Sequence, residues 1–357
     1  MRRKNLIVKR KVEKNLVQKN IKVKKIYQNF KKIISKNIGS KEFAVGVSGG
    51  ADSLCLSVLS KFYTSEFKNK IFFLIVNHNL RKDSHKEALK VQHILKKNKI
   101  ESKVLNWEGK VPKSNIQSNA RNIRYSLVSN FCKKKKIKYF VTAHHTDDQI
   151  ENFFIRLFRG SGLTGLSSMT ESVNYNSKLK IIRPFLGVKK TDLQFVTLKY
   201  FKTYIKDPSN KDMKFLRVRV REYLKNMEAE GLNTGNIIKT INNLLLANKA
   251  LGHYKSKALY NHTSFISKNK CLINKKIFEE EAEEIIFKSF SDILSLVSGK
   301  YYPPRSKKII NLISRVKKAK YYKSTLGGCL IEQKDNFLVI TKENKVKKIY
   351  HEEIVDK

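Results

Sequence analysis

The sequence predicts an α/β fold in which a parallel sheet carries helices on both faces, followed by a helical region and a small C-terminal α+β domain. Three observations predict it. Short apolar runs alternate with amphipathic helical patterns from residue 41 to about 160. Glycine-rich or polar turns follow two of the apolar runs, at the edge where ligands bind in such sheets. From about residue 226 the pattern changes to helices and then to short strands around Gly327 and Gly328.

The first apolar run and the turn after it organise the chain. Residues 43–56 read FAVGVSGGADSLCL, a strand followed by a glycine turn and the start of a helix. Paired glycines let the backbone approach an anion, and free N–H groups at a helix start point toward it. No Gly-Lys-Ser or Gly-Lys-Thr follows, so this is not a Walker A loop. We favour a phosphate cradle over an ordinary strand-to-helix turn, and it comprises Ser48, Gly49, Gly50, Ala51, Asp52 and Ser53.

The elements after this turn alternate as a parallel α/β sheet requires. Apolar runs predict buried strands over residues 71–76, 104–105, 139–143 and 181–182. Apolar residues at helical spacing predict helices that start near residues 84, 116, 146 and 189. Helices around 235–260, 277–298 and 305–318 precede the terminal strands.

Composition changes divide the chain into four expected parts. A Lys-rich extension covers residues 1–40, and its stretch 21–34 predicts a basic amphipathic helix that is either solvated or in contact with RNA. We expect a catalytic domain over 41–225, a helical connecting region over 226–300 and a small C-terminal domain over 301–357.

The charge of the chain predicts a polyanionic partner. Lys and Arg number 75 against 30 Asp and Glu, a formal charge of +45. A bias toward Lys, Asn and Ile explains part of the Lys content but not the scarcity of acids. Nucleic acid is therefore the first expected partner and an anionic membrane the second.

Cysteine usage and hydropathy predict a cytoplasmic protein. The four cysteines, Cys55, Cys132, Cys271 and Cys329, form no Cys-x-x-Cys pair, which argues against zinc knuckles, iron–sulfur clusters and a disulfide framework. The sequence has no apolar run of 18 residues and no apolar core of a secretory signal, so we expect no segment that spans a membrane and no secretory signal. Nothing in it favours a particular oligomeric state.

A second group of polar residues follows the strand at 139–143, in the stretch AHHTDDQIE. His144 and His145 lie at the strand end, and Asp148 and Glu151 are three residues apart on one face of the next helix. Like charges at this spacing repel unless a cation or a basic group lies between them. Mg²⁺ on ATP phosphates would serve, being a hard ion that prefers oxygen ligands. Simple helix capping by Asp147 and Asp148 is the alternative, and zinc is less favoured.

A third group lies on the helix that starts near residue 116. Arg121 and Arg124 share the face opposite the apolar stripe. A pair of arginines can hold phosphate in bidentate fashion, whereas a solvated basic face is an equally good interpretation in so basic a chain.

Together these residues carry a family resemblance. SGGADS at 48–53 resembles the PP-loop of the N-type ATP pyrophosphatases, which have a Rossmann-like fold and cleave ATP between the α and β phosphates. The segments after it closely resemble those of the tRNA(Ile)-lysidine synthases over about 41–225, with a weaker match at STLGGC near the C-terminus. These segments are VNHNLRKDS, the Ala120–Tyr125 stretch, TAHHTDDQIENFFIRLFRGSGLTGL, IIRPFL and DPSN at 207–210.

The resemblance implies a ligase that forms a C–N bond with ATP as its energy source. Its substrates would be free L-lysine and an isoleucine tRNA with a CAU anticodon, and its product lysidine, formed at C2 of the wobble cytidine through an adenylated intermediate. The PP-loop would hold pyrophosphate, Asp52 with Asp148 would hold Mg²⁺, and Arg121 would neutralise charge on the α phosphate. His144 or His145 would handle the proton of the attacking amine.

The same resemblance assigns tRNA contacts to basic residues. Residues 226–300 and 301–357 would bind tRNA, the latter with Tyr301, Tyr302, Tyr321 and Tyr322 among its basic side chains. In the catalytic domain, the expected contacts are Arg124, Arg217, Arg219 and Arg221.

Three positions depart from the family pattern. The family has Asp and Gly around the histidine of the second segment, where this chain has Asn77 and Asn79, and it has Asn where this chain has Val218.

Two rival functions stay open at this point. A tRNA thiolase of the same superfamily would need a nucleophilic cysteine near the PP-loop, and a non-catalytic RNA-binding protein would explain the charge but not the intact segments. An amidotransferase would need room for a glutaminase domain beside the tRNA-binding part.

Overall fold

The structure, a computed structural model, describes residues 20–80, 83–109, 116–207, 210, 212–300 and 303–343. Residues 1–19 of the expected extension, and Tyr301 and Tyr302, lie outside this range. The chain divides into two compact units, the first ending at Leu244 and the second starting at Leu245, both within helix α10 (Thr234–His262). Each unit has its own sheet.

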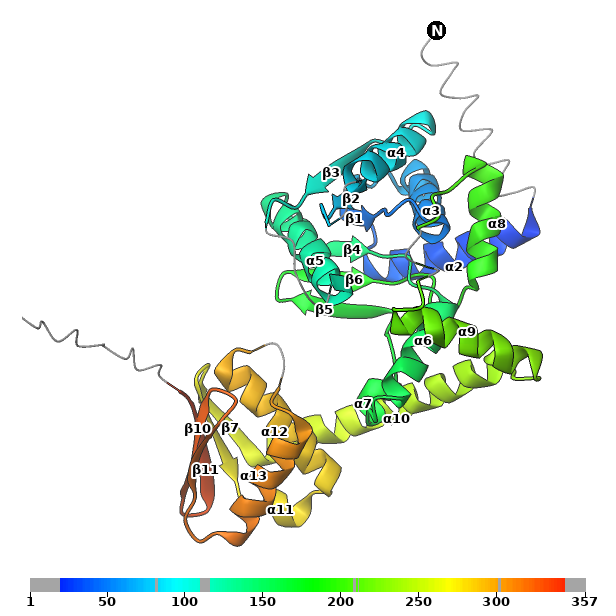
Figure 1. Cartoon of the computed structure of the whole chain (residues 1–357). Coiled ribbons are helices and arrows are strands. Elements are labelled where there is room, and N and C mark those ends of the chain that lie inside the picture. The colour runs from blue at the N-terminus through cyan, green and yellow to red at the C-terminus, as the bar shows by residue number, and fades with distance from the viewer. Residues whose placement is uncertain are drawn as a thin grey trace, which may run out of the picture. The chain divides into compact units, whose positions relative to one another are not determined.

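The first unit is built on a six-stranded sheet of order β3-β2-β1-β4-β6-β5 (Figure 1). All neighbouring strands pair in parallel except β5, which pairs antiparallel with β6 at the edge. The strands are β1 (Phe43–Gly46), β2 (Ile71–Asn77), β3 (Ser102–Asn106), β4 (Tyr139–Val141), β5 (Ser172–Asn176) and β6 (Leu179–Ile182). The predicted parallel sheet is confirmed, and the sequence missed only β5.

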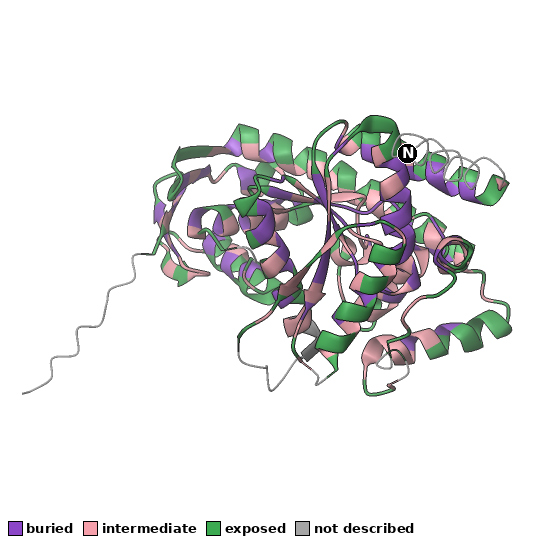
Figure 2. Ribbon diagram, turned by 90° about the horizontal axis from the view of Figure 1, so that it is seen from above, coloured by how far each residue is buried: buried purple, intermediate pink, exposed green. Residues whose placement is uncertain are grey.

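Alternate residues of the strands enter two separate cores, because successive strand side chains point to opposite faces. Phe43 and Val45 pack into one core, while Ala44 between them packs into the other. The first core is covered by α2 (Ile21–Asn37), α3 (Ala51–Phe67), α4 (Ser84–Lys97) and α8 (Lys190–Phe201). The opposite core is covered by α5 (Ile116–Lys134). Helices on both faces are thereby confirmed, and Figure 2 shows the buried residues along the strands.

A third apolar cluster holds the helices that follow β4. It joins Ile150 of α6 to Val220 and Leu224 of α9 and to Ile237 and Ile241 of α10. Helix α6 spans Thr146–Leu157, the short α7 spans Leu163–Leu166 and α9 spans Leu216–Ala229. This packing fixes α6, which carries the acidic residues that the sequence singles out.

Helix α2 is part of the core and not an extension. Its apolar stripe of Val23, Ile26, Tyr27, Phe30 and Ile34 is buried in the same core as α3. The predicted amphipathic helix is confirmed, but neither a solvated extension nor an RNA-contacting arm describes its apolar face. The expected boundary at residue 40 therefore does not separate this helix from the catalytic domain.

The second unit is an antiparallel sheet of order β7-β8-β11-β10-β9, against which α12 packs. The strands are β7 (Thr263–Ser267), β8 (Lys270–Asn274), β9 (Lys323–Leu326), β10 (Cys329–Lys334) and β11 (Phe337–Lys342). The helices are α11 (Ile277–Glu280), α12 (Glu283–Ser298) and α13 (Ser306–Lys318). The terminal strands were predicted, but β7 and β8 lie in residues 226–300, where the sequence predicts only helices. That expectation was incomplete, because these two strands belong to the C-terminal sheet.

Across the described ranges, the structure contains no helix long and apolar enough to cross a membrane.

Gly49 fixes the shape of the turn between β1 and α3. Its φ is +85°, in the left-handed region that side chains disfavour. A Cβ on Gly49 would lie 2.5 Å from Cγ2 of Val91 and 3.2 Å from Cδ1 of Ile205. The carbonyl oxygen of Gly49 also accepts a hydrogen bond of 2.9 Å from the N–H of Ile205. The turn is therefore packed on both sides and needs glycine.

We predict that Gly49→Ala destabilises the first unit by at least about 1–2 kcal/mol, because the left-handed backbone alone costs that much for a residue with a Cβ. Gly187→Ala is the matched control, since nothing lies within 4 Å of its added Cβ. Urea denaturation followed by circular dichroism measures both free energies of unfolding. Equal stability of the two variants would contradict this account of the turn.

Candidate active site

The turn after β1 is braced by its own serines and leaves the start of α3 open. The N–H of Ser48 donates to Oγ of Ser53 over 3.1 Å, and that hydroxyl donates to the carbonyl oxygen of Gly50 over 3.0 Å. Among the described residues, no side chain caps the first turn of α3. Its leading N–H groups are therefore free to bind an anion. From α8, the hydroxyl of Thr197 donates to the carbonyl oxygen of Ala51 over 2.6 Å and fixes the helix start.

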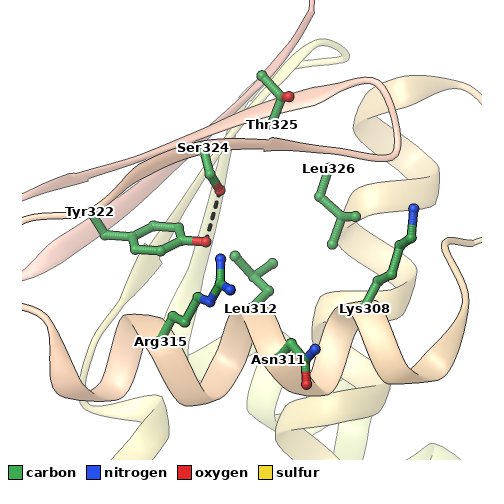
Figure 3. A pocket seen from close by; sticks show the side chains of 8 residues that line it. All are labelled: Lys308, Asn311, Leu312, Arg315, Tyr322, Ser324, Thr325 and Leu326. Carbon is green, nitrogen blue, oxygen red and sulfur yellow. Dashed lines mark hydrogen bonds between the residues drawn. The ribbon is translucent and has the colours of Figure 1, made fainter.

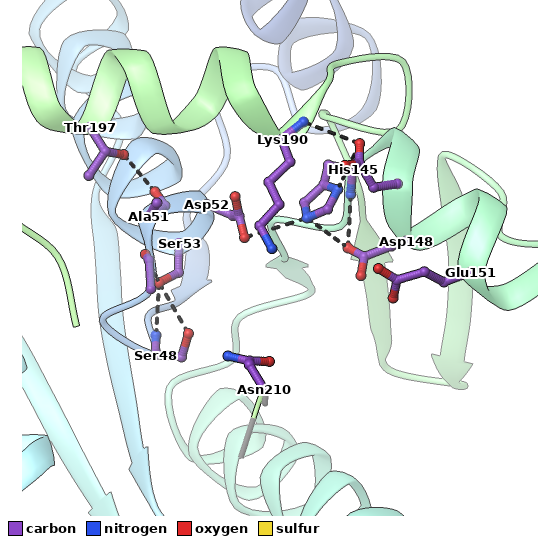
Figure 4. Close-up of polar contacts among 12 residues, drawn as sticks. Ser48, Ala51, Asp52, Ser53, His145, Asp148, Glu151, Lys190, Thr197 and Asn210 are labelled. Atoms are coloured by element: carbon purple, nitrogen blue, oxygen red, sulfur yellow. Dashed lines mark hydrogen bonds and ion pairs between the residues drawn. The ribbon is translucent and has the colours of Figure 1, made fainter. Parts of the chain in front are cut away.

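His145 connects this turn to helix α6 (Figure 4). Its Nε2 lies 3.5 Å from Oδ2 of Asp52 and 3.5 Å from Oδ2 of Asp148. Its side chain is only 4% exposed, and Nδ1 lies 3.8 Å from Oδ1 of Asp147. Strands β1 and β4 are neighbours in the sheet, so their carboxyl ends bring these residues together. The structure thus unites the PP-loop turn with the second group that the sequence predicts.

The charges around His145 favour its imidazolium form. Burial lowers the pKa of His145, but its hydrogen bond to Asp52 and the charges of Asp148 and Asp147 outweigh burial and raise that pKa. Burial would likewise raise the pKa of Asp148, yet the two histidines, Arg217 and the N–H of His145 hold it below its usual range. The carboxylate of Asp148 accepts that N–H over 3.1 Å. Asp148 therefore caps α6 and faces His145 at once.

His144 has the opposite character. It donates to or accepts from Oγ1 of Thr142 over 2.9 Å, and burial lowers its pKa to about 3. A ring with so low a pKa is neutral at physiological pH. The sequence leaves the two histidines equivalent, and the structure distinguishes them by their partners.

Glu151 is a buried acid of α6, which the sequence predicts to share a helix face with Asp148. Its carboxylate accepts Nε and Nη2 of Arg221 over 2.5 and 3.2 Å, and Oε2 lies 3.1 Å from Nε of Arg217. The basic groups required by the acidic pair of α6 are thus supplied by α9. Nη1 of Arg221 also donates to Oδ1 of Asn210 over 3.3 Å, which places the last residue of the DPSN segment at this cluster.

The remaining predicted arginines occupy different surroundings. Arg121 is exposed on α5, with its guanidinium 5.1 Å from the ring centroid of Tyr125. Its charge contributes to the lowered pKa of His144, so it lies within electrostatic reach of the site. Arg124 is exposed on the same helix. Nη1 of Arg219 donates to the backbone oxygens of Met213 and Lys214 over 3.2 and 3.4 Å.

Asn77 and Asn79, which replace the Asp and Gly of the family pattern, shape the end of β2. Nδ2 of Asn77 donates to Oδ1 of Asn106 over 3.1 Å, and its Oδ1 accepts the N–H of Asn79 over 3.1 Å. Asn79 has a φ of +51°, which Asn tolerates better than most residues. Val218 is half-buried in α9.

The acidic residues fit a metal ion that is bound partly by the protein and partly by the phosphates of a nucleotide. Within the described ranges, no group of three His, Cys, Asp or Glu side chains is arranged to hold an ion by itself. Oδ1 of Asp52 is nevertheless buried and has no hydrogen-bond partner among the described residues. Mg²⁺ typically takes one or two carboxylates and completes its shell with phosphate oxygens and water. Asp52 and Asp148 meet that requirement.

Comparison with known proteins places the chain among enzymes that use ATP to modify tRNA. The family model of the PP-loop domain matches residues 18–228. The chain is 33% identical over 314 residues to a tRNA(Ile)-lysidine synthase of Orientia tsutsugamushi, covering 85% of this chain and 70% of the relative. It is 33% identical over 330 residues to a tRNA(Ile)-lysidine synthase of Wolbachia pipientis wMel, covering 91% of this chain and 75% of the relative.

Solved structures show a more distant likeness. A U34-tRNA thiolase of Methanococcus maripaludis aligns at 20% identity with a TM-score of 0.49, over 62% of this chain and 78% of that chain. A likeness this distant does not bear on function.

We predict that Glu151→Gln destabilises the first unit by about 1–3 kcal/mol, because it leaves two partly buried guanidinium groups without their carboxylate. Glu222→Gln on α9 is the control, since it removes only the exposed pair of Glu222 with Lys225. Such a pair contributes about 0–1 kcal/mol. Denaturant titration measures both, and a larger loss in the control would be evidence against a structural role for the Glu151 cluster.

Proposed function

Because the chain belongs to the tRNA(Ile)-lysidine synthase family of PP-loop enzymes, we propose that it ligates free L-lysine to C2 of the wobble cytidine in an isoleucine tRNA with a CAU anticodon. ATP first adenylates the cytidine at that position and releases pyrophosphate. The ε-amine of lysine then displaces AMP and forms the C–N bond. The resulting lysidine pairs with A instead of G, so the codon read changes from AUG to AUA.

One structural observation supports this proposal. The carboxylates of Asp52 and Asp148 lie on either side of His145, whose Nε2 is 3.5 Å from Oδ2 of each. Asp52 belongs to the first turn of α3, so the open N-terminus of that helix lies at the same place. A triphosphate needs N–H donors for its anionic oxygens and carboxylates for the cation that accompanies it. Both kinds of group converge at the carboxyl ends of β1 and β4.

Each residue of the turn has a defined part in the proposed first step. The N–H groups at the start of α3 bind the β and γ phosphates, which leave as pyrophosphate. Ser48 and Ser53 keep the turn in the required shape through their mutual hydrogen bonds. The lack of a Walker lysine agrees with cleavage between the α and β phosphates.

Asp52 and Asp148 are the proposed ligands of Mg²⁺, which when bound offsets the negative charge that develops on the phosphates. Arg121 of α5, whose charge contributes to the lowered pKa of His144, is the proposed partner of the α phosphate. Of the two histidines, His145 is the better candidate for proton handling, because it contacts the carboxylates and has a raised pKa, whereas His144, with a pKa of about 3, accepts a proton poorly.

The tRNA is proposed to lie along the basic parts of both units. Arg124 is exposed and available to a phosphate. Arg217 and Arg221 are engaged with Glu151, so their contribution to tRNA binding is proposed to be indirect, through the position of α9. We retain residues 41–225, with α2 added, as the catalytic domain, and 226–300 and 301–357 as tRNA-binding parts.

Thiolase chemistry has no support from the cysteines. Cys55, the cysteine nearest the PP-loop in sequence, is fully buried in α3, and burial raises its pKa well above the ordinary value. A nucleophilic cysteine needs an exposed, lowered-pKa environment. A non-catalytic RNA-binding protein would have no use for the acidic pair opposite the PP-loop.

Incubation of the protein with ATP, labelled lysine and total tRNA tests the proposed function. We expect label in tRNA and release of AMP and pyrophosphate in equal amounts. Absence of lysine label, together with incorporation from a sulfur donor, would establish a thiolase instead.

Replacement of the proposed metal ligands tests the first step by itself. We predict that Asp52→Asn and Asp148→Asn each lower the rate of tRNA-dependent pyrophosphate release by about 10²-fold or more, the scale of losing one electrostatic group in such a site. Asp192→Asn is the control, because Asp192 pairs with Lys22 on the surface. A Mg²⁺ titration should show a raised requirement in the two site variants. Unchanged rates in both would refute the metal-binding role.

A further inference from the structure

A cavity of about 270 Å³ lies in the second unit, between helix α13 and strand β9 (Figure 3). Its polar lining is formed by Lys308, Asn311, Arg315, Tyr322, Ser324 and Thr325. Leu312 and Leu326 supply the apolar part of its wall. The proposed catalytic mechanism uses none of these residues.

The helix presents its charges to the cavity because of their spacing. Lys308, Asn311 and Arg315 are three, four and seven residues apart, so they share one face of α13. Figure 3 shows Lys308 and Arg315 extending from the helix toward the strand on either side of Leu312. Buried Ile309 and Val316 hold the helix against the core, which fixes the direction of this basic face.

The strand contributes hydroxyl groups. Oγ of Ser324 donates to the phenolic oxygen of Tyr322 over 2.9 Å, so both side chains already hold one orientation. Thr325 follows on β9, and its side chain points to the opposite face of the sheet (Figure 3). The cavity therefore joins an ammonium, a guanidinium, an amide and two hydroxyls, and its lining includes no carboxylate.

Among the described residues, the two cations of the cavity have no acidic partner. Some basic side chains of this unit have acidic partners, such as Lys317 with Glu283 and Lys323 with Glu332, whereas others have none among the described residues. In the part of the chain that the structure describes, no carboxylate lies within 4.0 Å of Lys308 or Arg315. Two unneutralised cations beside hydroxyl donors match an anion with several acceptor oxygens.

We propose that this cavity binds a phosphate group of the tRNA backbone, with the apolar wall of Leu312 and Leu326 against the adjoining ribose. Its volume lies below the roughly 300–1,000 Å³ typical of sites for whole small molecules, so a phosphate with part of its sugar fits better than a free nucleotide. The inference rests on the proposed function only in taking tRNA as the RNA that is bound. It assigns one defined phosphate contact to the second unit.

The test compares charge loss inside and outside the cavity in the full chain. We expect Lys308→Gln/Arg315→Gln to weaken binding of a CAU-anticodon isoleucine tRNA transcript about tenfold and to lower the slope of log K against log salt by about one. The control Lys268→Gln/Lys307→Gln removes the same charge from exposed positions outside the cavity and should change both quantities much less. Fluorescence anisotropy at several salt concentrations measures both variants, and circular dichroism confirms that both are folded.

A variant that keeps the charge separates a built site from a general basic field. Ser324→Ala removes one hydroxyl of the cavity and leaves every charge in place. We expect it to weaken tRNA binding about threefold with the salt slope unchanged, since a neutral hydrogen bond is lost without release of fewer counterions. Equal losses in the two double variants, together with no effect of Ser324→Ala, would overturn the proposal.

Two further measurements identify the source of the phosphate and the level at which a failure occurs. Inorganic phosphate at millimolar concentration should weaken tRNA binding less in the Lys308/Arg315 variant than in the wild type. Binding of phosphate or AMP to the cavity without any effect of the variant on tRNA affinity would overturn the assignment to RNA.

In the Lys308/Arg315 variant, lysine transfer at saturating tRNA should keep its kcat while the KM for tRNA rises. A wild type without lysine transfer would refute the proposed function and leave the comparison of tRNA affinities valid.

Discussion

The site depends on a single imidazole placed among three carboxylates. Asp52 comes from the turn after β1, and Asp147 and Asp148 come from the first turn of α6, so the three acids would repel one another without a cation. His145 lies 3.5 Å from two of them and 3.8 Å from the third. The raised pKa of His145 and the lowered pKa of Asp148 express the same attraction. Two loops from different strands are thereby held in one position.

A second cluster of opposite charges, around Glu151, supports the cluster around His145. Glu151, one turn further along α6, is held by Arg217 and Arg221 of α9. Ile150 beside it packs against Val220 and Leu224 of the same helix. The ion pairs and the apolar contacts act between the same two helices, so α6 is fixed along its length as well as at its start. The direction of Asp148 follows from this rigid support.

The sequence predicts those parts of the site that depend on local spacing. The strand–glycine–helix order at 43–56 and the acidic pair Asp148 and Glu151 were both readable, because each lies within one continuous stretch. The sequence does not predict the basic partners of Glu151, because Arg221 is 70 residues away and only helix packing brings the two together. Strand β7 was missed because it is an exposed edge strand without alternating apolar residues. The core role of α2 was hidden by its many lysines, although its apolar stripe has the required helical spacing.

The departure at Asn77 follows from its partner on the neighbouring strand. Asn77 and Asn106 are paired residues at the ends of β2 and β3, and the amide of Asn77 donates to Oδ1 of Asn106. An aspartate has no N–H and would leave that oxygen without this donor, unless Asn106 turned its amide around. The amide at 77 therefore keeps the hydrogen bond that closes this edge of the sheet and adds no negative charge. In the proposed site the metal ligands are Asp52 and Asp148, which lie on either side of His145, so the proposal assigns no ligand to residue 77.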